Sequence, residues 1–523
     1  MTTPPIESVA APTAIPVTQP SGLEKNLRVV ATGGGATFAS KLFLNVLRFI
    51  TAIWLARLLG ANQLGLYSLA LSALNLGMGI ALFGLDAGVI RYIAIQVARK
   101  DEDGVWGTIQ IGMGISILFS TVLGILLFAL ADILAINFFK EPRLTPLLQL
   151  SSVFVPMLVI NDMLGNALKG FKRIQWSSLA MFVYQPIVRL VAIAIVTLIG
   201  MTTSWAIVTY GLATVASSIV MIYYLHKHFG FKRPFGFRLK LFKDVVNFSF
   251  PVWLSGMMAK FQGNIQTIFI GSLSTIAGVG IFSVASQITS VSGEFSSAIN
   301  TSSKPIIAEL HERGDLSQME RIYQATNKWV ITMQLPIFLM MILLPTTILS
   351  IFGESFTGGA TALIILAVAD LLNTATGMGG VIIDMTGYTR LKLINSLARL
   401  ALYIVFDLLL IPKWGLLGAA IAVLAGEGMI NIARLVEVYV IFKMWPFDNS
   451  LFKPLAAGLV ALATFFGVRA AIPLGDNLII AIMQALVFCL IYAAVSMLLG
   501  FTPEELALIK NLGRFLPKKK KAK

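Results

Sequence analysis

Long apolar stretches separated by short polar connections make up almost the whole chain. A helix needs about 20 apolar residues to cross the hydrocarbon core of a membrane, and each stretch has roughly that length. None shows the period-two alternation of a membrane β-barrel, so the pattern predicts helices. To within a few residues, the expected helices are 30–58, 63–90, 108–136, 144–168, 176–199, 204–226, 245–272, 276–301, 324–352, 358–383, 389–411, 416–442, 451–472 and 477–499. We therefore predict an all-α polytopic membrane protein with about 14 transmembrane helices.

An internal repeat predicts how these helices are grouped. Residues 54–70 align without gaps on residues 269–285, and four positions are identical: Leu58, Gly65, Ser68 and Ala70 recur as Leu273, Gly280, Ser283 and Ala285. The offset of 215 residues spans six helices, an even number, so both copies keep the same orientation in the membrane. We therefore expect two six-helix lobes, related by an axis along the membrane normal, and two additional C-terminal helices.

The repeat and the composition of the connections divide the chain into six parts. These are a disordered cytosolic tail over 1–29, an N-lobe over 30–226, a cytosolic basic linker over 227–244, a C-lobe over 245–442, the two additional helices over 443–499 and a basic cytosolic tail over 500–523. The first tail is rich in Pro, Thr and Ala and has no apolar segment of the kind found in a signal peptide.

Composition and charge support the membrane assignment and give it an orientation. The chain is 57% hydrophobic and only 12% charged, which is unlike a soluble protein. Connections and tails on one side, with the helix turns that flank them, hold 28 of the 40 Lys and Arg, against 5 on the other side. The positive-inside rule therefore places both termini in the cytoplasm of a bacterial or archaeal cell. The same rule accounts for the net charge of +15, so that charge does not indicate nucleic-acid binding.

Several expected helices carry basic residues at membrane depth, where such residues are costly and usually functional. Thr37, Lys41, Asn45 and Arg48 follow one another at helical spacing and share one face. Further polar positions are Gln185 and Arg189 one turn apart, Lys260 with Asn264, and Arg399. A cluster of unpaired cations favours an anion, above all phosphate. The alternative is that each cation pairs with a carboxylate between packed helices.

Acidic residues are concentrated in the second half of the membrane region. Glu294, Asp370 and Glu427 lie within expected helices and are candidates for binding H⁺ or Na⁺ that drives transport. The alternative is that Asp370 and Glu427 neutralise Lys260 and Arg399. No metal-ligand spacing, nucleotide-binding loop or nucleophile motif is present in the sequence, so we expect no metal, no cofactor and no covalent chemistry.

Four motifs carry a resemblance to a known family. They are Lys41-Leu-Phe, Leu55-Ala-Arg-Leu-Leu-Gly60, Gly65-Leu-Tyr-Ser68 and the segment Phe83-Gly-Leu-Asp-Ala-Gly-Val-Ile-Arg-Tyr92. Together with the duplicated plan, they resemble the Wzx-like polysaccharide flippases of the multidrug/oligosaccharidyl-lipid/polysaccharide (MOP) exporter superfamily.

This resemblance implies a function and a site. It implies that a polyprenyl-diphosphate-linked oligosaccharide moves from the inner to the outer leaflet for surface polysaccharide assembly, with polymerase and assembly proteins as further partners. The diphosphate would enter a cationic cavity between the lobes while the lipid tail stays among membrane lipids. We place the diphosphate at Lys41, Arg48, Arg189 and Lys260. Asp86 and Arg91 match the family's second-helix motif, which implies a gate or lobe-packing role.

Three other functions remain open from the sequence. A multidrug antiporter of the same superfamily would use unpaired Asp370 and Glu427. A peptidoglycan-precursor flippase would share the fold and the lipid-diphosphate chemistry. A membrane-embedded transferase would need a catalytic site in a large extramembrane loop, and the expected connections are too short for one.

Overall fold

The computed structural model describes the backbone of residues 21–229, 238–471 and 478–499. Side chains are described from Asn45 onward, apart from Ser255 and a few positions next to the gaps. Within these ranges the chain consists of helices and short turns and contains no strand, so the prediction of an all-α protein is confirmed. The first helix begins at Ser21, inside the tail that was predicted over residues 1–29.

The first half of the chain forms seven α-helices within its described residues. They are α1 (Ser21–Ala81), α2 (Leu85–Ala98), α3 (Glu102–Ile133), α4 (Thr145–Gly170), α5 (Ile174–Leu179), α6 (Gln185–Ile199) and α7 (Thr203–Phe229). A π-helical turn over Leu134–Phe138 extends α3, a 3₁₀ turn over Pro142–Leu144 precedes α4, and a second π-helical turn over Ala180–Tyr184 joins α5 to α6.

The described part of the second half continues the helical pattern. Its helices are α8 (Leu239–Leu273), α9 (Ile276–Glu312), α10 (Leu316–Leu343), α11 (Pro345–Ser350), α12 (Ala360–Ala375), α13 (Gly379–Met385), α14 (Thr389–Phe442), α15 (Phe452–Ala471) and α16 (Leu478–Leu498). Short 3₁₀ turns lie at Glu354–Gly359 and Asn449–Leu451.

Every predicted span coincides with helical residues, but several helix boundaries differ from the prediction. They differ at glycines, where hydropathy gives no signal. Gly60 and Gly415 have positive φ angles and form tight bends inside α1 and α14, so each of these elements contains two predicted spans. Conversely, Phe83 and Gly84 have positive φ angles and end α1 within the predicted span 63–90, which continues as α2. Gly377 likewise separates α12 from α13.

Eleven helical stretches in the described part of the chain are long and apolar enough to cross a membrane. Two of them, Asn45–Ala81 and Thr389–Phe442, contain the bends at Gly60 and Gly415. The protein is therefore a multi-pass membrane protein, and the total of about 14 crossings stays a prediction.

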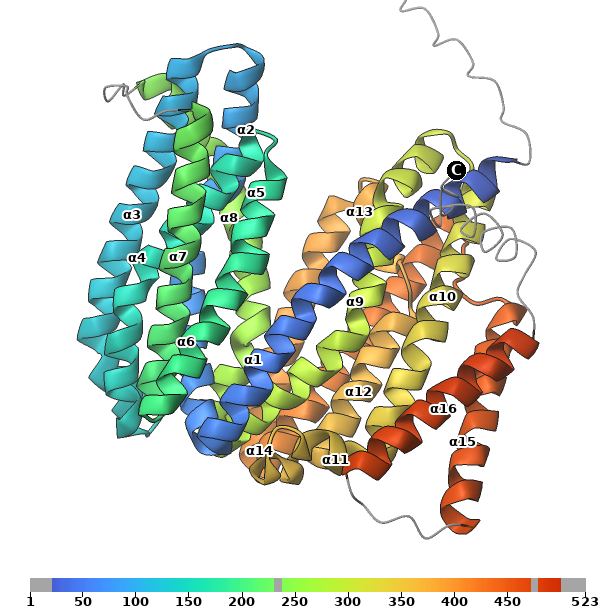
Figure 1. Ribbon diagram of the computed structural model, residues 1–523. Coiled ribbons are helices and arrows are strands. Elements are labelled where there is room, and N and C mark those ends of the chain that lie inside the picture. Colours follow the sequence, from blue (N-terminus) through green and yellow to red (C-terminus); the bar gives the residue numbers. More distant parts are fainter. Residues whose placement is uncertain (1–20, 230–237, 472–477, 500–523) are drawn as a thin grey trace, which may run out of the picture.

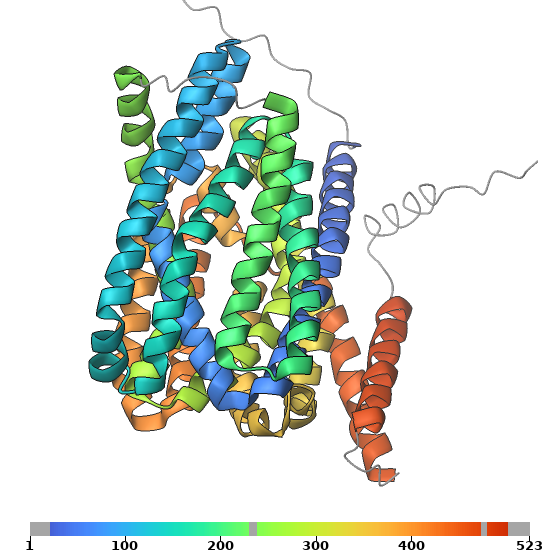
Figure 2. The ribbon, with the colours of Figure 1, turned by 60° about the vertical axis from the view of Figure 1, so that its left-hand side comes forward.

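The helices form two bundles that diverge toward one end (Figure 1). The N-lobe contains α2 to α7 with the second part of α1, and the C-lobe contains α9 to α14. Helices α15 and α16 lie outside the C-lobe, where Phe465 and Phe488 pack with Leu335 and Leu339 of α10 (Figure 2). The two predicted lobes and the two additional helices are thus present.

The lobes meet at the opposite end through a contact that repeats about the pseudo-twofold axis. A Cβ atom at Gly65 would overlap the carbonyl oxygen of Ile276, and a Cβ atom at Gly280 would overlap that of Ala61. Gly280 and Ile276 lie 215 residues after Gly65 and Ala61, so the repeat relates one contact to the other and the two are equivalent. Without side chains at these two positions, the backbones of α1 and α9 approach closely.

Further contacts reinforce this closed end. The largest buried apolar cluster contains residues of both lobes, including Leu55 and Tyr67 from α1 and Val279 from α9. The Arg57 Nε donates to the Ile351 carbonyl oxygen at 2.8 Å, and the Ala61 N–H donates to Ser355 Oγ at 3.2 Å. Apolar burial and hydrogen bonds therefore both hold the lobes together here.

Helix α8 packs against both lobes. In its first part, Ser249 lies against the backbones of Gly84 and Gly88 of the N-lobe, and the Tyr92 hydroxyl donates to the Asp244 carbonyl oxygen at 3.0 Å. Farther along, the Gln262 Nε2 donates to the Ser396 carbonyl oxygen of α14 at 2.8 Å. The first turns of the predicted C-lobe therefore lie on the N-lobe, and α8 connects the two.

Candidate functional site

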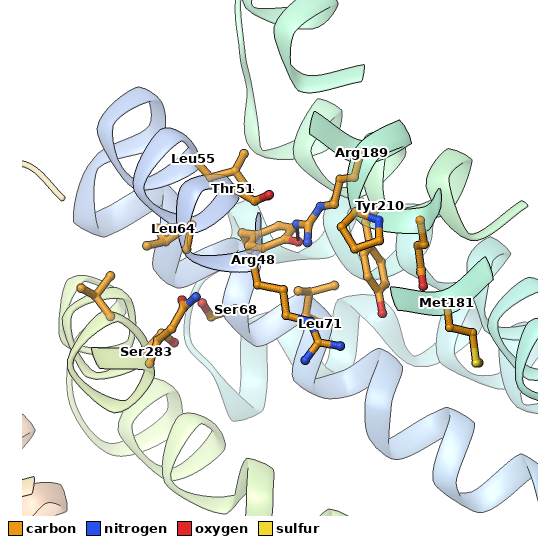
Figure 3. Close-up of a pocket in the computed structure, with 16 residues that line it drawn as sticks. Arg48, Thr51, Leu55, Leu64, Ser68, Leu71, Met181, Arg189, Tyr210 and Ser283 are labelled. Carbon is orange, nitrogen blue, oxygen red and sulfur yellow. Dashed lines mark hydrogen bonds between the residues drawn. The ribbon is translucent and has the colours of Figure 1, made fainter. Parts of the chain in front are cut away.

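A cavity of about 400 Å³ lies between the lobes and contains two of the predicted basic residues, Arg48 and Arg189. Its walls come from both parts of α1, from α6 and α7 of the N-lobe, and from α9 of the C-lobe, which contributes Ser283 (Figure 3). We call it the N-lobe cavity. The Arg48 and Arg189 side chains extend into the same space from α1 and α6, and Tyr210 of α7 lies beside Arg189.

The Arg189 guanidinium is held by aromatic side chains rather than by a carboxylate. Its Nη2 donates a hydrogen bond to the Tyr67 hydroxyl, and its Cζ lies 5.1 Å from the centre of the Tyr210 ring. Among the described residues, its Nε has no hydrogen-bond partner and no acidic side chain pairs with it. No carboxylate in the described part of the chain therefore balances the charge of Arg189, and one of its buried donors is unused.

The second guanidinium, on Arg48, is more exposed. Its Cζ lies 5.8 Å from the centre of the Phe182 ring, and no carboxylate of the described part of the chain pairs with it. Together, the two residues supply planar donor groups of the kind that bind phosphate oxygens in pairs.

A π-helical turn positions the α6 side of the cavity. This turn, Ala180–Tyr184, ends directly before Gln185 and Pro186, which interrupts the regular hydrogen bonding of the helix. The Gln185 Nε2 donates to Thr214 Oγ1 of α7 at 3.0 Å, and this bond fixes α6 against α7. Gln185 and Arg189, one turn apart, therefore both line the cavity, as their spacing indicates.

The other predicted diphosphate ligands lie elsewhere. Lys260 is half-buried on α8 and packs against the backbone of Gly79, where it interacts electrostatically with Asp162 of α4. The Asn264 Nδ2 donates to the Lys260 carbonyl oxygen at 2.8 Å. Neither residue lines the N-lobe cavity, and neither does the half-buried Asn45.

Two further predicted residues, Thr37 and Lys41, belong to α1, but their side chains fall outside the described residues.

The residues predicted for gating lie where α2 meets α8. The Arg91 guanidinium carbon is 4.3 Å from the centre of the Phe248 ring, a contact between the N-lobe and the first part of α8. Asp86 lies in the first turn of α2 and interacts electrostatically with Asp162. Arg91 thus contacts the first part of α8 and Asp86 lies near Asp162 within the N-lobe, and the gate or lobe-packing role of the two residues stays a prediction.

A second cavity of about 450 Å³ lies in the C-lobe and contains Asp370 and Glu427. We call it the C-lobe cavity. Asp370 Oδ2 accepts hydrogen bonds from Gln334 Nε2, at 2.5 Å, and from the Ser292 hydroxyl. Glu427 Oε1 accepts from the Tyr403 hydroxyl at 2.5 Å.

Two further ionisable residues that were predicted as functional are Arg399 and Glu294. Glu427 Oε1 also lies 3.5 Å from Arg399 Nη1, so these two residues form an ion pair. Arg399 is therefore neutralised, as the alternative reading of the sequence anticipated for it. Glu294 is half-buried on α9 and lines neither of the two cavities.

The two cavities are related by the internal repeat. Six positions of the N-lobe cavity recur in the C-lobe cavity at the same offset: Arg48, Thr51, Ala52, Tyr67, Ser68 and Leu71 correspond to Gly263, Gln266, Thr267, Phe282, Ser283 and Ser286. Ser283 lines both cavities. At the equivalent positions the one cation, Arg48, is replaced by Gly263, and the carboxylates Asp370 and Glu427 of the C-lobe cavity come from positions outside these six.

Sequence reasoning missed several residues that the structure brings into these sites. Tyr67 and Tyr210 hold Arg189, and Gln334 and Ser292 hold Asp370. Tyr67 stands in the Gly65-Leu-Tyr-Ser68 motif and at a repeat position, but a tyrosine in an apolar helix is equally consistent with packing. Ser292 and Gln334 gave no signal in the sequence, because neither lies at helical spacing from a charged residue.

A further missed residue is Asp407 of α14. It is fully buried, and neither of its carboxylate oxygens has a hydrogen-bond partner among the described residues. A lone aspartate in an otherwise apolar segment was the signal in the sequence.

The fold and the cavities define a helical membrane transporter with two repeated lobes. Residues 30–311 match the family described as polysaccharide biosynthesis protein, and residues 251–409 match the MatE family. The first match covers more than half of the chain, so the chain belongs to the polysaccharide biosynthesis protein family.

Relatives in sequence extend over most of the chain. The stage V sporulation protein B of Bacillus subtilis is 22% identical over 426 residues, which are 76% of this chain and 82% of the relative. The probable low-salt glycan biosynthesis flippase Agl15 of Haloferax volcanii is 22% identical over 489 residues, which are 92% of this chain and 98% of the relative.

Solved structures share the same architecture. The lipid II flippase MurJ in an inward closed conformation has a TM-score of 0.73 at 13% identity, covering 89% of this chain and 98% of that one. An inward-facing multidrug resistance MATE transporter of the MOP superfamily has a TM-score of 0.65 at 18% identity, covering 76% and 94%. The fold is therefore that of the MOP superfamily, as the sequence motifs indicated.

Proposed function

We propose that this protein is a flippase that moves a polyprenyl-diphosphate-linked oligosaccharide from the cytoplasmic to the outer leaflet for surface polysaccharide assembly. The observation that carries the proposal is the pair of guanidinium groups, Arg48 and Arg189, in the cavity between the lobes without a carboxylate partner in the described part of the chain. Unpaired charge at membrane depth is costly unless a ligand of opposite charge uses it. The membership in a polysaccharide biosynthesis family supports a diphosphate-linked glycan as that ligand.

Alternating access of the two lobes supplies the transport step. The α2–α3, α9–α10 and α13–α14 connections lie at the end where the lobes diverge (Figure 1). These connections and the helix turn that follows the last one carry Arg99, Lys100, Arg313, Arg390 and Lys392, so the positive-inside rule assigns that end, and both termini, to the cytoplasm. This conformation is therefore the one that loads substrate from the inside, with the outer end closed.

The paired glycine contacts form the outer seal in this scheme. Gly65 and Gly280 allow α1 and α9 to approach on either side of the pseudo-twofold axis. Separating these two contacts opens the cavity to the outside without disturbing the packing within either lobe. The lobes then move as rigid bodies about the substrate, as in other repeated transporters.

An ion gradient, of H⁺ or Na⁺, completes the proposal as the energy source. Glu294, Asp370 and Glu427 are the predicted carriers, and two of them line the C-lobe cavity. Collapse of the gradient should stop transport while leaving diphosphate binding unchanged.

Lipid-linked sugars in a strain that lacks the gene test the proposed function. We expect oligosaccharide-linked lipid to accumulate on the cytoplasmic leaflet and surface glycan to be lost. The double variant Arg48→Gln/Arg189→Gln should fail to restore surface glycan, because it removes the diphosphate-binding charge. Arg143→Gln is the matched control, since Arg143 is exposed and pairs with Glu141 outside the cavity. Normal surface glycan without accumulation, or full rescue by the double variant, would contradict the proposal.

A second candidate function is multidrug antiport. The MatE match over residues 251–409 and the carboxylates Asp370 and Glu427 in the C-lobe cavity favour it. Efflux of a cationic dye that disappears in Asp370→Asn, with surface glycan intact, would establish the antiporter and exclude the flippase.

A further inference from the structure

The C-lobe cavity occupies the repeat position of the proposed diphosphate site, yet its lining cannot bind a diphosphate. Where the N-lobe cavity has Arg48, the C-lobe cavity has Gly263. Its two carboxylates, Asp370 and Glu427, repel anions, and the nearby Arg399 is already paired with Glu427. The duplicated pocket has therefore kept its place and its size but requires a different ligand.

Two unsatisfied polar atoms identify the chemistry of that ligand. The Nε2 of Gln266 is a hydrogen-bond donor without a partner in the described part of the chain, and only 7% of this residue is exposed. The Oε2 of Glu427 is an acceptor that likewise has no partner there. Buried polar atoms are normally hydrogen-bonded. Both atoms are covered in this conformation, but both residues line the cavity, so a ligand that supplies both complements would be favoured once their side chains turn toward it.

A sugar hydroxyl supplies both complements, because it accepts one hydrogen bond and donates another. A metal cation would leave the Gln266 donor unsatisfied, since cations bind oxygen atoms and not N–H groups. Thr267, Ser286 and Asn373 add hydroxyl and amide groups to the wall, and the cavity of about 450 Å³ is large enough for a sugar unit. The Phe282 and Tyr403 rings add apolar surface for the carbon face of a sugar.

The position of this cavity relative to the N-lobe cavity fits one elongated headgroup. Ser283 of α9 lines both cavities, so the two meet at this residue. A lipid diphosphate held by Arg48 and Arg189 would therefore extend its first sugars past Ser283 toward Gln266 and Glu427.

We propose that the C-lobe cavity is the glycan subsite of the transporter and takes an uncharged sugar next to the diphosphate. This assignment rests on the proposed function, because it assumes that the N-lobe cavity holds the diphosphate. It makes the sequence divergence between the two repeats the basis of substrate recognition: one lobe binds the phosphates and the other selects the sugar.

Binding to the purified full-length protein tests the proposal with three probes. They are undecaprenyl diphosphate without sugar, the same lipid carrying N-acetylglucosamine and the same lipid carrying glucuronic acid. We expect N-acetylglucosamine to tighten binding about ten-fold over the sugar-free lipid, the effect of roughly one well-formed hydrogen bond to a charged group. The acidic sugar should bind no more tightly than the sugar-free lipid, because Asp370 and Glu427 repel it.

Variants assign the effect to the cavity. Gln266→Leu should lose the preference for N-acetylglucosamine and keep the affinity for the sugar-free lipid. Asp370→Asn should bind the glucuronic acid lipid more tightly than the wild-type protein does, because it removes one of the repelling charges. Gln266→Leu alters no charge, so it remains informative if Asp370→Asn does not fold. Asp384→Asn is the control, because Asp384 pairs with Lys392 outside the cavity.

The outcomes separate this inference from the proposed function. Equal affinity for all three probes, or tighter binding of the acidic sugar, would overturn the glycan subsite and leave the diphosphate site standing. Retention of the N-acetylglucosamine preference in Gln266→Leu would place the sugar elsewhere and also overturn it, whether or not Asp370 carries the coupling ion. Wild-type affinity for the sugar-free lipid in Arg48→Gln/Arg189→Gln would instead refute the diphosphate site itself.

Discussion

The N-lobe and C-lobe cavities share a backbone framework and differ in charge. Six lining positions correspond through the 215-residue offset, yet Arg48 is replaced by Gly263 and Tyr67 by Phe282. The remaining charges also differ in how they are balanced. Arg189 has no carboxylate partner in the described residues, whereas Arg399 lies 3.5 Å from Glu427. The repeated positions thus line a cavity in each lobe, while the substitutions change the charge of the wall.

The closed end of the molecule shows the opposite behaviour. Gly65 and Gly280 are identical in the two copies because each must leave room for a carbonyl oxygen of the other lobe. A contact between backbones tolerates no side chain, so both copies keep glycine. A cavity wall tolerates many side chains, so the copies could diverge there.

The largest expected effect is a difference in stability between variants of the paired cation Arg399 and of the unpaired cation Arg189. Arg399→Gln leaves Glu427 as an uncompensated buried charge, which should cost about 3–5 kcal/mol of stability, and adding Glu427→Gln should restore most of it. Arg189→Gln should cost only about 1 kcal/mol, since it removes one hydrogen bond to Tyr67 and leaves no carboxylate unbalanced. Thermal unfolding of the purified variants measures both effects. A stability loss in Arg189→Gln as large as that in Arg399→Gln would show that Arg189 is a structural cation.

The next effect concerns the outer seal. Gly65→Ala and Gly280→Ala should each force α1 and α9 apart, at a cost of about 1–3 kcal/mol to the closed outer end. In a background with Ser68→Cys and Cys489→Ser, a membrane-impermeant maleimide added from outside should then label the cavity faster. Gly114→Ala is the matched control, because a Cβ there meets open space. Labelling at the control rate would show that the glycine pair does not seal the outer end.

A smaller effect compares Tyr67 with its repeat position. Tyr67→Phe removes the hydroxyl that accepts a hydrogen bond from Arg189, so diphosphate binding should weaken about ten-fold as the guanidinium loses its orientation. Phe282→Tyr, the reciprocal change in the C-lobe cavity, should leave diphosphate binding unchanged. The affinity of both variants for undecaprenyl diphosphate tests this difference between the two cavities. An equal loss of affinity in Tyr67→Phe and Phe282→Tyr would contradict it.

The smallest effect lies at the cytoplasmic end of the N-lobe. A hydrogen bond from the Gly104 backbone N–H, together with Arg238, lowers the pKa of the Asp101 carboxyl below its ordinary value. Its contribution to stability is therefore present above the unfolded pKa, about 3.9, and is lost only as pH falls through the lower folded pKa. Asp101→Asn should cost less than about 1 kcal/mol, and equally at pH 5 and pH 8. A loss that differs between these two pH values in unfolding experiments would contradict this.

Much of the fold could be predicted from the sequence because hydrophobic length and the positive-inside rule act on whole segments. The repeat at residues 54–70 and 269–285 indicated the two lobes, and its glycines Gly65 and Gly280 prove to be the contact between them. The bends at Gly60 and Gly415 were not predictable, since each replaces a loop by a single backbone conformation that leaves hydropathy unchanged.

The candidate site was predictable only in part, because helical spacing shows which residues share a face but not what that face contacts. Arg48 and Arg189 converge in one cavity, whereas Lys260 packs beside Gly79 near Asp162. All three were equally prominent as cations in apolar segments. What separates them is the crossing of α8 from one lobe to the other, a tertiary feature that no local pattern encodes.

The central claim is that two unpaired guanidinium groups bind a lipid diphosphate. Its most direct test is the affinity of the purified protein for undecaprenyl diphosphate against undecaprenyl monophosphate. We predict that the wild-type protein prefers the diphosphate at least about ten-fold and that Arg48→Gln/Arg189→Gln loses this preference, since each charged contact contributes about 1.5–3 kcal/mol. An equal preference in the wild-type protein and the double variant would contradict the account.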